Sequence, residues 1–85
     1  MEEILLANGF IAKGFCSVCS GQAKEYQKVV GVKLVKVKVY GRNQHRPTGM
    51  TWVERGDAMI VIGGSKTKVQ KPEYMVSTLE FMKLV

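Results

Sequence analysis

The stretch that decides the fold is VKLVKVKVY at residues 32–40. From residue 35 onward, valines occupy every second position and alternate with Lys36, Lys38 and Tyr40. Successive side chains of a β-strand point to opposite faces, so this period of two predicts a strand with one buried and one hydrated face. The adjacent apolar residues Leu34 and Val35 break the alternation, and there we expect a β-bulge or a change of sheet.

Weaker strand patterns lie on both sides of this stretch. Residues 10–15 fit a short strand, and residues 25–30 fit either a strand or a short helical turn. Residues 41–49 have the composition of a polar loop. Residues 50–53 and 59–62 fit two strands joined through a turn at Arg55-Gly56-Asp57. The sequence therefore indicates a small antiparallel sheet or a partly closed barrel.

The segment at residues 72–85 fits either a helix or a strand. Pro72 suits the first turn of a helix, and the apolar side chains at positions 75, 76, 79 and 82 form a stripe at helical spacing. Residues 78–84 would also serve as a strand. We expect the helix, so the predicted fold class is mainly β or α+β, with a C-terminal helix that covers the sheet.

The composition fits one small domain over residues 1–85. Hydrophobic residues make up 46% of the chain and charged residues 24%, which is typical of a folded domain and not of a disordered segment. The longest purely apolar run, Ala58 to Ile62, is far too short to span a membrane. Glu2 and Glu3 stand where a secretory signal would carry positive charge, so we expect a cytoplasmic protein with reduced cysteines.

Basic residues are concentrated in one part of the sequence. The net charge is +6, and no acidic residue occurs between Tyr26 and Val53. That window contains Lys28, Lys33, Lys36, Lys38, Arg42 and Arg46, and a second basic cluster follows at Lys66, Lys68 and Lys71. This asymmetry indicates either a polyanionic partner or a charge distribution that only keeps the protein in solution.

The hydrated face of residues 35–40 is the candidate nucleic-acid site. Lysine and arginine side chains neutralise phosphates, and an aromatic ring on a sheet can stack on a base. The predicted contact residues are Lys36, Lys38, Tyr40, Arg42 and Arg46, with Lys66 and Lys68 as flanking contacts. The alternative is that lysines on a strand serve only to prevent edge-to-edge aggregation.

Cys16 and Cys19 form a C-x-x-C pair whose chemistry the sequence leaves open. Two thiolates at this spacing can bind zinc in a knuckle-like turn with His45 as a further ligand, but a structural zinc site needs four ligands. A thioredoxin-like redox pair is a second interpretation, although Gly21 interrupts the helix that such a pair requires. The third interpretation is a pair of structural thiols in a turn beside the core.

The sequence contains no evident catalytic set. His45 is the only histidine, and the seven carboxylates are scattered without an acid–base pair. We therefore predict a non-catalytic binding module, with nucleic-acid binding through the Lys/Arg/Tyr face as the main hypothesis. The alternative is a protein–protein assembly role, with a protein partner or as a homo-oligomer, based on the apolar residues Phe81, Met82, Leu84 and Val85.

Overall fold

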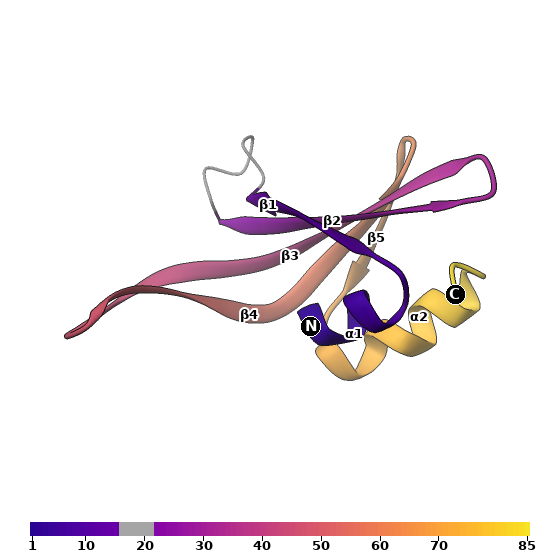
Figure 1. The fold of residues 1–85 in the computed structure, drawn as a ribbon. Helices are drawn as coiled ribbons and strands as arrows, with labels where there is room; N and C mark the ends of the chain where they lie inside the picture. The colour runs from indigo at the N-terminus through magenta and orange to yellow at the C-terminus, as the bar shows by residue number, and fades with distance from the viewer. Residues whose placement is uncertain (16–21) are drawn as a thin grey trace.

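The alternating stretch at residues 32–40 forms the centre of a five-stranded antiparallel sheet. The computed structural model describes residues 1–15 and 22–85. Its elements are α1 (Glu2–Ala7), β1 (Ile11–Phe15), β2 (Ala23–Val30), β3 (Lys33–Arg46), β4 (Gly49–Ile62), β5 (Ser65–Val69), the 3₁₀ helix η1 (Pro72–Tyr74) and α2 (Met75–Phe81). The strand order is β1-β2-β3-β4-β5, so each strand pairs with its neighbours in sequence (Figure 1).

The predicted antiparallel sheet and C-terminal helix are confirmed. The sheet is open rather than barrel-like, because β1 and β5 lie at its two edges. Residues 25–30 belong to a strand and not to a helical turn. In α2, Met75 and Leu79 are buried while Val76 is exposed, so the buried stripe is narrower than the predicted apolar stripe.

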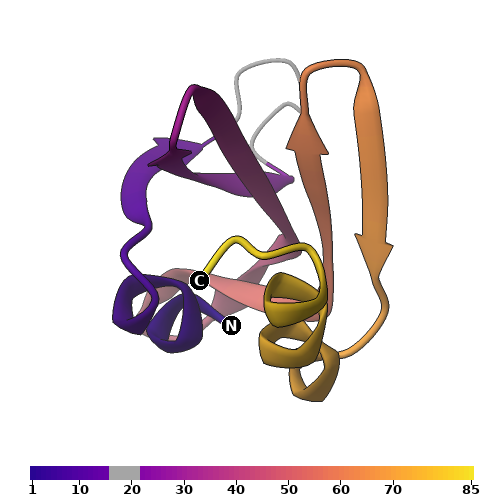
Figure 2. The ribbon, with the colours of Figure 1, turned by 90° about the vertical axis from the view of Figure 1, so that its right-hand side faces the viewer.

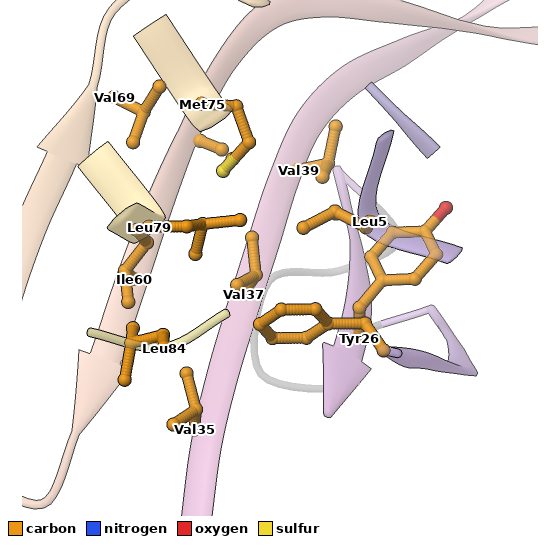
Figure 3. Close-up of a cluster of buried hydrophobic side chains, with 12 residues drawn as sticks. Leu5, Tyr26, Val35, Val37, Val39, Ile60, Val69, Met75, Leu79 and Leu84 are labelled. Carbon is orange, nitrogen blue, oxygen red and sulfur yellow. The ribbon is translucent and has the colours of Figure 1, made fainter. Parts of the chain in front are cut away.

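The core lies between one face of the sheet and the two helices (Figure 2). Val35, Val37 and Val39 are fully buried on this face, as their alternation predicts. Figure 3 shows Leu5 from α1 and Met75 and Leu79 from α2 packed against them, together with Tyr26 and Ile60 from neighbouring strands. Burying one such aliphatic side chain contributes about 1.5–3 kcal/mol. The opposite face of the sheet therefore carries the lysines.

The β3–β4 hairpin differs from the sequence-based expectation in two places, at its tip and in the middle of β4. The predicted polar loop at residues 41–49 is wrong, because these residues extend β3 and begin β4 around a two-residue turn at Pro47 and Thr48. Their side chains alternate without an apolar face, which hides a strand from a hydrophobic pattern. In Figure 1 this part of the hairpin projects well beyond the other strands.

The predicted turn at Arg55-Gly56-Asp57 is also wrong, because β4 continues through these residues as one strand. The pairing runs from Val39 with Ala58 directly to Gly41 with Glu54, so three residues of β4 lie opposite the single residue Tyr40. Gly56 has a φ of +103°, a backbone conformation that glycine adopts at low cost. The irregularity of β3 therefore lies here and not at Leu34 and Val35, whose pairing with β2 is continuous.

Partly buried polar contacts attach both helical segments to β2. The Lys28 ammonium group donates hydrogen bonds to the carbonyl oxygens of Asn8 and Leu84, each at 2.8 Å. The Tyr26 hydroxyl group donates to the Glu2 carboxylate. Burial of the phenol, reinforced by this bond, raises the pKa of Tyr26 well above its ordinary value. These contacts explain how α1, which the hydrophobic pattern did not predict, is held against the sheet.

Within residues 1–15 and 22–85, no helix is both long enough and apolar enough to cross a membrane.

Candidate nucleic-acid interface

The sheet face opposite the helices carries four of the predicted contact residues side by side. In the register of β3, β4 and β5, Lys36 lies opposite Val61, which lies opposite Lys66. The next row on this face is Lys38, Met59 and Lys68. We call Lys36, Lys38, Lys66 and Lys68 the lysine quartet. Given the usual strand spacing, its Cα atoms form a rectangle of about 7 by 10 Å around two apolar side chains.

No lysine of the quartet forms an ion pair with a carboxylate of the described residues. The only two ion pairs among these residues are the Met1 amino group with Glu54, and Arg55 with Asp57. Two carboxylates lie near the quartet without pairing with it: Asp57 interacts electrostatically with Lys68, and Glu25 lies opposite Lys38 across the β2–β3 pairing. The quartet therefore keeps a surplus of positive charge over these two carboxylates.

Tyr40 is half-buried on the same face, and an arginine covers its ring. The Arg55 guanidinium group lies 5.2 Å from the ring centroid and donates two hydrogen bonds of 2.7 Å to Asp57. The hydrogen bonding from Arg55 lowers the pKa of Asp57 below its ordinary value. Arg55 is not among the predicted contact residues, because the sequence pattern predicts a turn there. Its position over the Tyr40 ring makes it part of the surface.

Arg42 and Arg46 lie further along β3, on the part of the hairpin that we call the arm, residues 42–53. They continue the alternation of Lys36 and Lys38, so they share the outer face, and both are exposed. The Arg46 guanidinium group donates to the Gln44 side chain at 3.2 Å. The predicted contact residues thus divide between two places, the quartet on the sheet and the arginines on the arm.

Two of the three predicted zinc ligands, Cys16 and Cys19, lie outside the described residues, so the metal and redox interpretations of this pair stay predictions. His45 alternates with Arg42 and Arg46, and is therefore on the other face of the arm. Residues 1–15 and 22–85 contain no cluster of three or more His, Cys, Asp or Glu side chains that could hold a metal ion.

An aromatic cluster marks the base of the arm. The Trp52 ring lies over Gly41, where a Cβ atom would come within 2.3 Å of the indole Cζ2. Phe15 meets the indole edge-on with ring centroids 6.2 Å apart, and the Lys24 ammonium group lies 4.7 Å from the indole centroid. The glycine at position 41 is required by this close approach. The cluster fixes the base of the arm to β1 and β2.

Apolar side chains are exposed beside the quartet. Ile11, Val29 and Leu34 are 62%, 68% and 45% exposed and line a hollow of about 130 Å³. Val29 lies opposite Leu34 in the β2–β3 pairing. No local sequence pattern predicts this patch, because its residues come from three strands.

The predicted apolar C-terminal surface is only partly exposed, because Leu84 is in the core while Phe81 remains 88% exposed.

Comparisons with known protein families, with curated proteins and with solved structures gave no match to this chain.

Proposed function

We propose that this protein binds nucleic acid through the outer face of its sheet, with no catalytic step. The observation that supports the proposal is the lysine quartet, in which four ammonium groups from β3 and β5 lie on one face without ion-pair partners among the described residues. The helices occupy the other face, so an extended polyanion can reach the quartet. Arg42 and Arg46 continue the same positive surface along β3.

The main driving force is the release of counterions from phosphates. If the four lysines of the quartet each neutralise one phosphate, the logarithm of the affinity falls with the logarithm of the salt concentration with a slope of about −3 to −4. Met59 and Val61, between the lysines, offer an apolar surface to sugars or bases. Tyr40 with its stacked Arg55 provides a flat surface for an exposed base.

The test compares two variants of equal charge. Lys36→Glu/Lys38→Glu removes half of the quartet, whereas Lys71→Glu/Lys83→Glu changes two exposed lysines beside η1 and α2. Each double variant lowers the net charge from +6 by four units, to +2. In a mobility-shift assay at low salt, the first variant should bind a 20-nucleotide probe at least about tenfold more weakly, and the second should bind like the parent protein.

The salt dependence provides a second readout. Lys36→Gln/Lys38→Gln should reduce the magnitude of the salt slope by about 2, because two phosphate contacts are lost. Equal losses of affinity in the quartet variant and the control variant would mean that net charge alone is responsible. Unchanged binding by the quartet variant would remove the proposal.

Protein docking is the second candidate function, and the exposed apolar patch of Ile11, Val29 and Leu34 supports it. Isolated exposed apolar residues are common, but a contiguous group around a hollow is typical of an interaction surface. If the patch joins two copies of the chain, light scattering across a concentration series should show a dimer, and Leu34→Lys should convert it to a monomer. A protein that is monomeric at all concentrations would exclude this form of assembly.

A further inference from the structure

We infer that the nucleic acid is duplex DNA and that the arm, residues 42–53, enters its major groove. This inference rests on the proposed function, because it names the form of nucleic acid that the same surface would bind. β2 pairs with β3 only as far as Tyr40, and β5 pairs with β4 only as far as Ala58. Beyond these residues the two strands have only each other as described partners.

The dimensions of the arm match a DNA groove. Its five residue pairs, from Arg42 with Val53 to Arg46 with Gly49, give a ribbon about 17 Å long. The major groove of B-form DNA is about 12 Å wide and admits a two-stranded ribbon, whereas the major groove of A-form RNA is too deep and narrow for side chains to read. The shape therefore favours duplex DNA over duplex RNA.

The side chains of the arm have the chemistry that base edges require. Arg42 and Arg46 can pair with guanine, and Asn43 and Gln44 can pair with adenine. Residues 42–53 contain no acidic residue that would repel phosphates. Polar groups occur on both faces of the ribbon: Arg42, Gln44 and Arg46 lie on one face, and Asn43 and His45 lie on the other, opposite Trp52 and Met50 of β4. A ribbon inside a groove meets nucleic acid on both sides, so polar groups on both faces suit this placement.

The arm and the quartet can act on one duplex. Arg42, Gln44 and Arg46 continue the alternation of Lys36 and Lys38, so the arm presents its arginines on the face that carries the lysines. The aromatic cluster of Trp52, Gly41 and Phe15 fixes the base of the arm. With the arm in the groove, the quartet would lie against the phosphates beside it.

The experiment uses one mixed-sequence duplex of 20 base pairs in two forms. In the second form every cytosine carries a glucosylated 5-hydroxymethyl group, which fills the major groove and leaves the minor groove and the phosphates unchanged. The intact protein should bind the filled duplex at least about tenfold more weakly than the plain duplex. It should also bind the plain duplex more tightly than a duplex RNA or a single strand of the same sequence.

Two arm variants serve as controls. In the first, Asn-Gly replaces residues 45–50, which shortens the arm. The natural two-residue turn is closed by the pair of Arg46 with Gly49. The pair of Gln44 with Thr51 lies two pairs nearer the body and therefore has the same hydrogen-bonding type, so it can close the same kind of turn. The second is Arg42→Ala/Arg46→Ala, which leaves the backbone intact. Both keep the quartet, and circular dichroism checks their folding. Both should bind the plain and the filled duplex with equal, weakened affinity.

The outcomes separate the inference from the proposed function. Equal binding of the intact protein to the plain and filled duplexes, with the loss in Lys36→Glu/Lys38→Glu still present, overturns the arm's role and leaves nucleic-acid binding in place. Tighter binding to duplex RNA or to the single strand also overturns the inference. Absence of binding to every probe overturns both.

Discussion

The same two strands, β3 and β4, form two different structures along their length. In the body of the protein, residues 33–40 and 57–62, they lie between β2 and β5 and bury every second side chain under the helices. In the arm, each is the other's only strand partner among the described residues, and the positions that continue the buried face hold Asn43 and His45 on β3 and Trp52 and Met50 on β4. Met50 is apolar and still 59% exposed, so an inward position joins the core only where the helices cover it.

The two regions are consequently stabilised by different forces. The body combines a hydrogen-bonded ladder with buried aliphatic side chains, whereas in the arm only Trp52, at the base, packs against the core. A two-stranded hairpin in water is only marginally stable. The arm therefore depends on its base, where Trp52 lies over Gly41 and Phe15 lies against the indole.

The largest expected difference comes from placing the same charge in each region. Val37→Asp puts a carboxylate among fully buried side chains and should cost at least about 4 kcal/mol, enough to abolish a cooperative unfolding transition. His45→Asp, on the exposed arm, should change the free energy of unfolding by less than about 1 kcal/mol. Urea unfolding followed by circular dichroism measures both. Similar losses in the two variants would show that the arm is packed as tightly as the body.

The boundary between the regions is tested by Gly41→Ala. The new methyl group would lie 2.3 Å from the indole Cζ2 and 2.5 Å from the Val53 carbonyl oxygen, so the Trp52 ring and the backbone must both move. We expect a loss of about 2–3 kcal/mol in thermal or urea unfolding. The matched control is Gly64→Ala, where nothing lies within 4 Å and no loss is expected. A neutral Gly41→Ala would mean that the indole does not fix the arm.

A smaller difference should follow from removing one cation in each region. Lys28→Met leaves the carbonyl groups of Asn8 and Leu84 without their donor and should cost about 1–2 kcal/mol. Arg46→Met, in the arm, removes only an exposed contact with Gln44 and should cost less than about 0.5 kcal/mol. The same unfolding assay serves here. A Lys28→Met protein as stable as its parent would indicate that this anchor contributes nothing net.

The smallest effect is a pH dependence that arises in the body, because the arm contains no carboxylate. Hydrogen bonding from Arg55 lowers the pKa of Asp57 in the folded protein, so the unfolded chain binds its proton first as the pH falls. The stabilisation is present above the ordinary pKa of 3.8 and is lost as the pH falls through the lower folded value. The melting temperatures of the parent protein and Asp57→Asn should therefore converge in acid. A gap that stays constant from pH 7 to pH 2 would contradict this origin.

Sequence reasoning succeeded where burial follows one simple period. The alternation at residues 35–40 identified the buried valines and the lysine face, and the apolar stripe identified the C-terminal helix. It failed in the arm, because residues 41–49 have no apolar face and their polar side chains match the composition of a loop. The sequence pattern also divided β4 into two strands at Arg55-Gly56-Asp57, because a glycine between charged residues occurs in bulges as well as in turns.

The sequence predicted most residues of the candidate surface, but not how they are arranged across the strands. Lys36 and Lys38 were assigned from local alternation, but their position across β4 from Lys66 and Lys68 depends on a register that no local pattern contains. The stack of Arg55 on Tyr40 required the bulge, and the apolar patch required three strands to come together. Long-range pairing therefore explains each feature that the sequence analysis missed.

The indole at the base of the arm gives this protein an intrinsic optical probe. Trp52 is the only tryptophan in the chain, so its emission reports on one place in the fold without labelling. That place is the junction between body and arm, where the ring contacts the backbone of Gly41 and the Lys24 ammonium group lies 4.7 Å from the ring centroid. Detachment of the ribbon would hydrate the ring and shift its emission to the red while the far-ultraviolet signal of the body stays unchanged. A single spectrum can thus distinguish a loosened hairpin from a melted domain.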